Sequence, residues 1–149
     1  MVIRKMTEAD LDQVTAVEEA CFSRPWSRQG FLDSMRSDEG IFLVAESLDT
    51  VPHGMGYIGM IASIDEGEIT NVAVAAKSRR LGVGEALLNA VRQEATRRGL
   101  VRIVLEVRVS NAPAIGLYEK MGFSSLGIRR NFYDFPREDA LIMALEEIC

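Results

Sequence analysis

The chain has 149 residues, of which 48% are hydrophobic and 26% charged, and its formal net charge is −5. This length and balance fit one globular domain spanning 1–149, and the acidic charge argues against a nucleic-acid surface. No apolar run approaches the ~20 residues that cross a membrane. Two isolated cysteines and one histidine give no basis for a disulfide framework, a metal site or a Ser-His-Asp triad. We therefore expect a cytoplasmic protein.

The first half of the chain predicts two short helices followed by antiparallel strands. Thr7 and Asp10 have the spacing of a capping box at a helix start. Pro25 and Trp26 then break the helical pattern before Ser27 opens a second helix. Polar or Asp/Gly-containing turns separate the strands that follow, which is typical of an antiparallel meander. The expected strands and helices lie, in order, at 2–4, 7–22, 27–37, 41–46 and 55–63.

The stretch 68–98 combines a strand, a basic turn with glycines, and a helix. Residues 69–75 are apolar and partly β-branched, as in a buried strand, and 83–98 carries apolar residues at helical spacing. The turn between them, 77–84, holds two glycines and three cations. Free N–H groups at a helix start bind anions, and glycines let the backbone approach a phosphate closely. We therefore interpret this stretch as a phosphate-binding site.

The second half of the chain predicts a parallel crossover and two closing strands. The strand at 101–107 follows the helix, so the strands near Ile69 and Val101 should be parallel neighbours in a βαβ unit. The expected fold is α/β, a mixed and mostly antiparallel sheet with one central parallel pair and helices on both faces. The remaining elements, a short helix and two strands, are expected at 111–121, 123–130 and 140–145.

Glu106 stands late in a strand that is otherwise rich in Val, Ile and Leu. Period-2 counting places it on one face with Arg102 and Val104. Its carboxylate is then partly desolvated or points into a cleft, and either environment suits a general base. An ion pair with Arg102 or Arg108 is an alternative that this strand alone does not exclude.

Two motifs in order resemble those of the GNAT family of N-acetyltransferases. Residues 79–84 have the Arg-x-x-Gly-x-Gly pattern of that family's coenzyme A pyrophosphate loop, and 111–123 is similar to its Asn-x-x-Ala-x-x-Leu-Tyr-x-x-x-Gly-Phe signature. The elbow at 22–27, the Leu-Glu-Val-Arg run at 105–108 and the tail 129–143 further resemble the RimI-type branch, which acetylates N-terminal α-amines of ribosomal protein. That branch often has Gly where this chain has Arg80.

The resemblance implies that acetyl-CoA is the cosubstrate and enters a splayed gap between the two parallel strands. Glu106 matches the family's general base, which deprotonates the acceptor amine, and Tyr118 its general acid, which protonates the leaving thiolate. Asn111 would contact the cofactor by its side chain. Backbone groups along the pantetheine arm would come from Val72, Ala73 and Val74. The pyrophosphate would be held by Arg79, Arg80, Gly82, Val83, Gly84 and Glu85.

The acceptor implied by the resemblance is a protein N-terminus, in a ribosomal protein, with no nucleic-acid or membrane partner and no metal. A GNAT enzyme that acetylates lysine side chains or a small amine is a second hypothesis. A lysine amine, with a pKa near ~10.4, demands more of the base than a peptide α-amine near ~8. A non-catalytic acyl-CoA-binding module that regulates a partner is a third. The sequence does not determine the oligomeric state.

Overall fold

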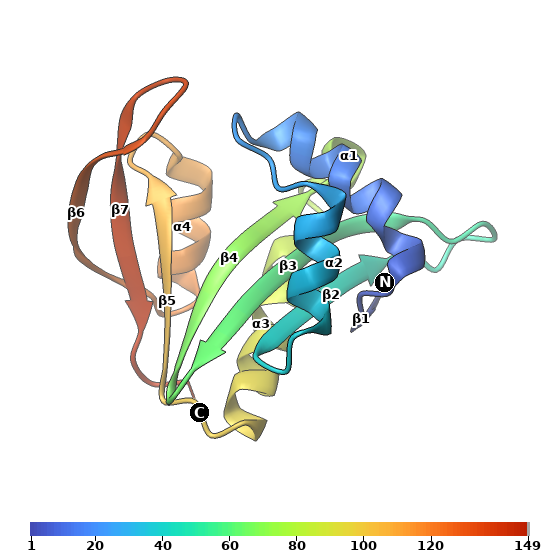
Figure 1. Ribbon diagram of the computed structural model, residues 1–149, viewed down its shortest axis with the longest axis horizontal. Helices are drawn as coiled ribbons and strands as arrows, with labels where there is room; N and C mark the ends of the chain where they lie inside the picture. The colour runs from blue at the N-terminus through green and yellow to red at the C-terminus, as the bar shows by residue number, and fades with distance from the viewer. Residues whose placement is uncertain (149) are drawn as a thin grey trace.

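The computed structural model describes residues 1–148 as a seven-stranded sheet with helices on both faces (Figure 1). The strand order is β1-β2-β3-β4-β5-β7-β6, and every neighbouring pair is antiparallel except β4 and β5. This confirms the predicted mixed α/β sheet. The strands are β1 (Val2–Lys5), β2 (Gly40–Glu46), β3 (Gly54–Ser63), β4 (Glu66–Val74), β5 (Arg102–Arg108), β6 (Ser124–Tyr133) and β7 (Glu138–Leu145).

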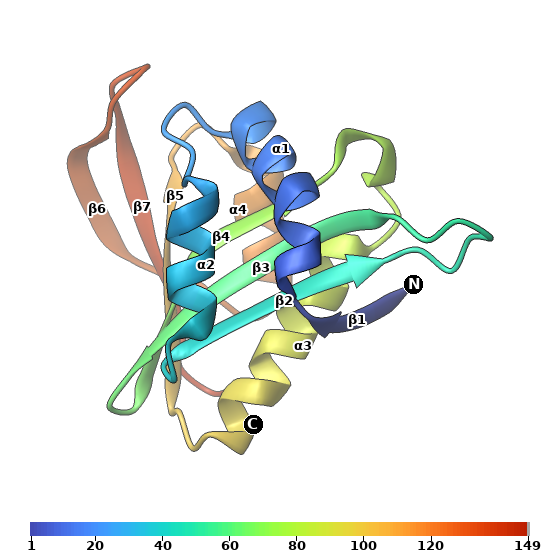
Figure 2. The same ribbon diagram turned by 45° about the vertical axis from the view of Figure 1, so that its right-hand side comes forward.

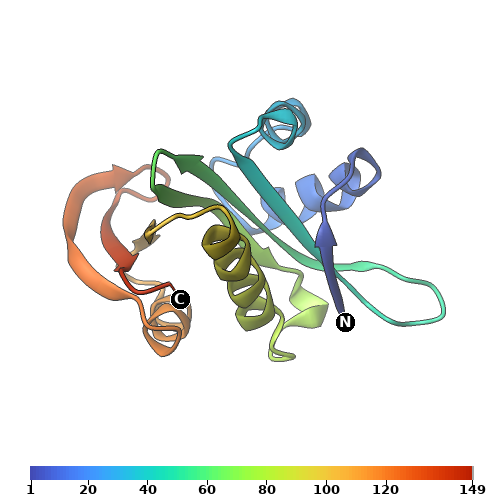
Figure 3. The ribbon, with the colours of Figure 1, turned by 90° about the horizontal axis from the view of Figure 1, so that it is seen from below.

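The helices are divided between the two faces of the sheet, as Figures 2 and 3 show. Each face encloses its own apolar cluster. The cluster beneath α3 and α4 includes Leu87, Val91 and Ile103, whereas the cluster beneath α1 and α2 includes Leu11 and Phe31. The helices are α1 (Leu11–Cys21), α2 (Arg28–Arg36), α3 (Val83–Arg97) and α4 (Ala112–Lys120), with short 3-10 turns at Glu8–Asp10 and Ala76–Ser78.

Local signals in the sequence account for the helix boundaries. Thr7 N donates to Asp10 Oδ2 at 2.7 Å, so the predicted capping box is confirmed. Ser27 Oγ accepts from Gly30 N at 3.0 Å and caps α2. Gly99, in the left-handed conformation with φ +76°, follows α3 and ends it.

The hairpins differ from the prediction at their boundaries. Ser63 already pairs with Glu66, so the β3–β4 turn is tighter than the one expected at 65–67, and Ile64 within it has φ +57°. The last hairpin is longer than predicted, because Tyr133 pairs with Glu138 beyond the apolar runs at 123–130 and 140–145. Asn131 and Phe132 in this extension are exposed and Tyr133 is half-buried, so the extension carries no alternation of apolar and polar residues by which a strand is recognised.

The two parallel strands diverge soon after they begin. β5 pairs with β4 over three residues only, ending at Glu68 and Val104, whereas β3 pairs with β4 along its length. The register between β3 and β4 shifts at Thr70, which is the extra residue between Ile69 and Asn71. Such a bulge bends a strand, and beyond it β4 runs away from β5 in Figure 1. The predicted splaying of the parallel pair is thus present.

Candidate active site

The open edge of β4 provides backbone groups beside the point of divergence. Val72, Ala73 and Val74 pair with Ile58, Tyr57 and Gly56 of β3 on one side. On the other side no strand among residues 1–148 pairs with them. The amide and carbonyl groups that face this edge are therefore available to an extended ligand.

The loop between β4 and α3 presents free N–H groups at a helix start. Ala86 N donates to Gly82 O at 3.0 Å, and within the described chain the N–H groups of Val83, Gly84 and Glu85 donate to no backbone carbonyl. Gly82, with φ +77°, turns the chain into α3. The positive end of the helix dipole therefore coincides with three free donors, which is the arrangement that binds a phosphate.

Gly84 brings the start of α3 close to α4. A Cβ at Gly84 would lie 3.0 Å from Leu117 Cδ2, so a larger residue would crowd this junction. The Glu85 carboxylate pairs with Lys120 Nζ at 3.1 Å, so the backbone N–H of Glu85 is the group that remains for a ligand. The loop therefore fits a pyrophosphate bound mainly by backbone.

The cationic side chains of the loop are exposed, as phosphate recognition requires. Arg79 Nη2 lies 3.8 Å from Cys21 Sγ at the end of α1. Arg80 has φ +65°, the conformation that glycine adopts freely. The loop therefore holds an arginine in a conformation that costs glycine little.

Asn111 is the N-cap residue of α4 and lies directly before its first helical residue. Its side-chain Oδ1 accepts from Ala114 N at 3.3 Å, so the amide oxygen caps the helix. The NH₂ group of the same amide is the part that remains for a ligand.

Glu106 faces the side of the sheet on which α1 and α2 lie, away from the buried Leu105 and Val107. Its Oε2 lies 3.3 Å from Nη1 of Arg129, which reaches it from β6 across β7. Ala140 of β7 pairs with Arg129, and its small side chain leaves room for that reach. The two arginines that the sequence offered as alternatives, Arg102 and Arg108, pair elsewhere.

Tyr118 of α4 is a buried aromatic whose ring contacts Phe123, with centroids 5.8 Å apart. Burial, together with the nearby Tyr133 hydroxyl, raises the pKa of Tyr118 to about 12. Burial and then the Glu106 carboxylate raise the pKa of Tyr133. Tyr133 of β6 lies beside Arg108, which follows Glu106 by two residues on β5, and Tyr118 lies on α4.

Arg108 holds the loop between β6 and β7 above this group. Its guanidinium donates to the carbonyls of Asp134 (3.0 Å) and Pro136 (2.9 Å), pairs with Glu138 at 3.2 Å, and lies 4.4 Å from the Tyr133 ring centroid. Glu138 also accepts from Ser110 N at 2.7 Å, and this hydrogen bond, reinforced by Arg108, lowers the pKa of Glu138. The loop is therefore anchored to β5 and to the start of α4.

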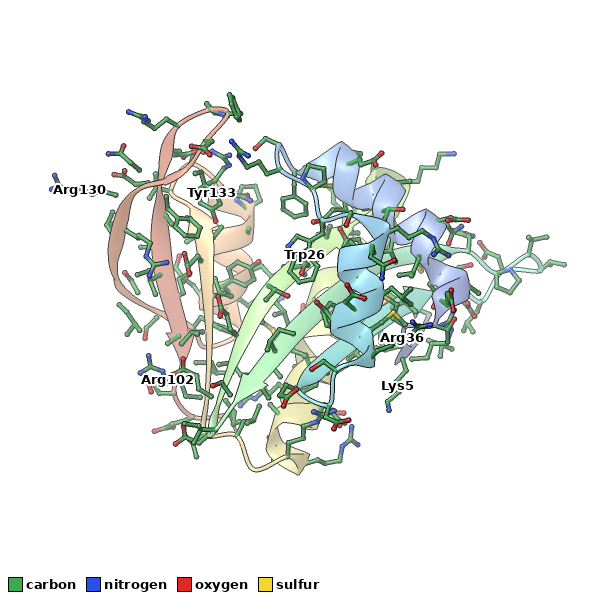
Figure 4. The ribbon with its side chains drawn as sticks, viewed as in Figure 1. Lys5, Trp26, Arg36, Arg102, Arg130 and Tyr133 are labelled. Atoms are coloured by element: carbon green, nitrogen blue, oxygen red, sulfur yellow. The ribbon has the colours of Figure 1, made fainter. Side chains whose placement is uncertain are left out.

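The loop between α1 and α2 meets the β6–β7 loop from the other side. Arg24 pairs with Asp134 at 3.0 Å and lies 5.0 Å from the Phe135 ring centroid, and Arg108 Nη2 donates to Ser23 Oγ at 3.3 Å. Figure 4 shows Trp26 and Tyr133 on opposite sides of the region where β4 and β5 diverge. Arg108, on the same strand face as Glu106, therefore contacts both loops.

The sequence pattern assigned no function to Arg129 or Arg108. Arg108 follows Glu106 by two residues on the same strand face, and this spacing was the one signal available for it. The partner of Glu106 lay on another strand, which no local pattern reveals.

The model of the Acetyltransferase (GNAT) family matches residues 11–123. The chain belongs to the GNAT family of acetyltransferases. Among relatives of this GNAT protein, the ribosomal protein bS18-alanine N-acetyltransferase of Escherichia coli K12 is 34% identical over 145 residues, covering 96% of this chain and 95% of its own. A Bacillus subtilis protein provisionally given the same name is 37% identical over 142 residues, covering 95% of this chain and 92% of its own.

Solved GNAT structures share the whole architecture. The crystal structure of the ribosomal-protein-S18-alanine N-acetyltransferase from E. coli aligns with a TM-score of 0.87 at 32% identity, covering 99% of this chain and 95% of that one. In this GNAT protein, no helix of residues 1–148 is both long and apolar enough for a membrane span. The same residues contain no group of three or more His, Cys, Asp or Glu placed to hold a metal ion.

Proposed function

We propose that this GNAT enzyme transfers the acetyl group of acetyl-CoA to the N-terminal α-amine of a ribosomal protein. The observation that carries the proposal is the position of Glu106, a half-buried carboxylate on the side of β5 that the two loops flank, beside the point where β4 and β5 diverge. The acceptor is suggested by relatives that carry the name ribosomal protein bS18-alanine N-acetyltransferase and match along nearly the whole chain. Such an acceptor places the reaction in the cytoplasm.

In this proposal, acetyl-CoA lies along the open edge of β4 with its pyrophosphate at the start of α3. The free N–H groups at the beginning of α3 receive the phosphates, and the backbone at Val72 to Val74 donates to the thioester carbonyl as negative charge develops on its oxygen. The residues assigned to acetyl-CoA are Val72, Ala73, Val74, Arg79, Arg80, Gly82, Val83, Gly84, Glu85 and Asn111.

Glu106 takes a proton from the acceptor ammonium, directly or through a water molecule. A peptide α-amine has a pKa near ~8, so part of it is protonated at neutral pH and must lose a proton before its nitrogen attacks the thioester carbon. Arg129 pairs with the same carboxylate, so the acceptor ammonium takes the place of the Arg129 guanidinium beside Glu106.

Tyr118 stabilises the leaving sulfur. With a pKa of about 12, its phenol stays protonated throughout the neutral range. It donates a hydrogen bond to the sulfur as the carbon–sulfur bond breaks, and the thiol leaves with a proton that passes through this hydroxyl. No covalent bond to the protein is needed, because the amine attacks the thioester directly.

Coenzyme A release with two short peptides tests the proposal. One peptide has a free N-terminal alanine and no lysine, and the other has a blocked N-terminus and one lysine. We expect turnover of the first only, lost in Glu106→Gln. Turnover of the second peptide only would instead assign lysine as the acceptor. A third peptide, with the N-terminal sequence of bS18, covers a stricter sequence requirement. Acetyl-CoA binding without turnover of any of the three peptides would favour a non-catalytic module.

A further inference from the structure

Glu18 is a buried carboxylate that the proposed reaction does not use. It lies on the inner face of α1 with 2% of its surface exposed. Three groups donate to it, namely Tyr57 Oη at 2.6 Å, Trp26 N at 2.9 Å and Asn71 Nδ2 at 3.1 Å. All three donors are neutral, so the carboxylate depends on these hydrogen bonds to offset its burial.

The three donors come from three separate parts of the protein. Tyr57 is on β3, Asn71 is on β4 directly before Val72, and Trp26 is in the loop between α1 and α2. The bond from Trp26 N joins the loop to α1, whereas the other two bonds join α1 to strands of the sheet. Glu18 therefore connects the main chain of this loop to the part of β4 at which the thioester is proposed to lie.

The same loop forms one side of the approach to Glu106. Arg24 and Ser23, just before Trp26, contact Asp134 and Arg108 of the opposite side. The Trp26 ring packs against Phe31, with centroids 5.3 Å apart. The hydrogen bond from Trp26 N to Glu18 adds a contact that fixes the main chain at this residue.

We propose that Glu18 is a positioning residue that fixes the α1–α2 loop and thereby sets how tightly the acceptor binds. This inference rests on the proposed acetyl transfer, because it assigns the acceptor side of that site. Glu18 acts through Trp26 and touches neither substrate. Its loss should therefore weaken acceptor binding and leave acetyl-CoA binding at the α3 end unchanged.

A conservative variant should rescue the function, because Trp26 N and Asn71 Nδ2 donate to the same oxygen of Glu18, Oε2. In Glu18→Gln, a carbonyl oxygen at that position accepts from both groups as before. The new NH₂ group then lies where Oε1 was and can donate to the Tyr57 hydroxyl. Glu18→Leu offers no acceptor to Trp26 N.

The test measures the acceptor KM, kcat and the Kd of acetyl-CoA in these variants. We expect Glu18→Leu to raise the acceptor KM about tenfold or more, the scale of one lost hydrogen bond to a charged group, with the acetyl-CoA Kd unchanged. Glu18→Gln should stay close to wild type. If Glu18→Leu does not fold, Glu18→Asp should show the same rise, since its shorter side chain cannot reach all three donors.

Tyr57→Phe is the matched control, because it removes a donor to Glu18 and keeps the bond to Trp26. It should lower the stability of the protein without changing the acceptor KM. An unchanged acceptor KM in Glu18→Leu or Glu18→Asp, or an equal rise in Tyr57→Phe, would overturn the proposal. Failure of the proposed function is separate, because it appears in wild type as a lack of α-amine turnover. If wild type uses lysine instead, the same comparison is made with the lysine peptide.

Discussion

Glu106 on β5 and Arg129 on β6 form an ion pair with a nitrogen–oxygen distance of 3.3 Å, although β7 lies between their strands. The carboxylate side chain is 21% exposed and the guanidinium side chain 55% exposed, so solvent reaches the pair mainly from the arginine side. The proposed base is thus oriented by the arginine and open to an incoming ammonium. It is the feature of the site on which the first prediction depends.

Replacing Glu106 with Gln should lower kcat/KM for an N-terminal alanine peptide by about 10²- to 10⁴-fold, the usual contribution of a positioned base. Acetyl-CoA binding, measured by calorimetry, should change little, because the amide keeps the shape of the side chain. Glu119→Gln, at an exposed position of α4, is the matched control and should leave kcat/KM unchanged. A loss of less than tenfold in Glu106→Gln would remove Glu106 from the reaction.

Tyr118 should couple stability to pH in the alkaline range. Its pKa is about 12 in the folded protein, against 10.0 for an ordinary tyrosine. The folded state therefore holds this proton more tightly, so the stabilisation is fully present below pH ~10 and is lost as the pH rises toward ~12. The loss amounts to roughly 2–3 kcal/mol.

Urea unfolding of wild type and Tyr118→Phe at pH 8.5 and pH 11 isolates this effect, because the other titrating groups are common to both. The free energy of unfolding should fall more steeply with pH in wild type. Parallel slopes would show that the phenol is not held in its protonated form. The Phe variant should also lose activity at neutral pH, since it has no hydroxyl to donate to the leaving sulfur.

The sequence predicted the features that depend on neighbouring residues. Ser27 caps its helix and Gly99 ends another because each acts on its own turn. The divergence of β4 and β5 followed only from the family resemblance, since its local cause is the register shift at Thr70. Arg129 was missed as the partner of Glu106 because it approaches from a strand two positions away in the sheet.

Glu18 shows the same limit on the other face. No pattern in the sequence singled out Glu18, a charged residue beside Val17. It is buried because donors from three other parts of the chain converge on it. Burial of a charged side chain depends on partners that are assembled only in the folded chain.

Gly84→Val should weaken acetyl-CoA binding about tenfold or more. The new side chain meets Leu117 at the junction of α3 and α4 and shifts the turn whose N–H groups are proposed to hold the pyrophosphate. Gly116→Ala is the control, since a Cβ there meets nothing within 4 Å. It should keep the acetyl-CoA Kd and stabilise the protein by about 0.5–1 kcal/mol through helix propensity. An equal loss of affinity in both variants would show that the effect is not local to the loop.

Arg129→Gln should lower the acceptor KM by about two- to fivefold. Arg129 competes with the acceptor ammonium for Glu106 and repels it, and an exposed pair of this kind contributes about 1 kcal/mol or less. The effect should shrink as salt is added, because both interactions are screened. Arg129→Lys, which keeps the charge, should behave more like wild type. If Arg129→Gln instead raises the acceptor KM at low salt, Arg129 orients the base for the acceptor rather than competing with it.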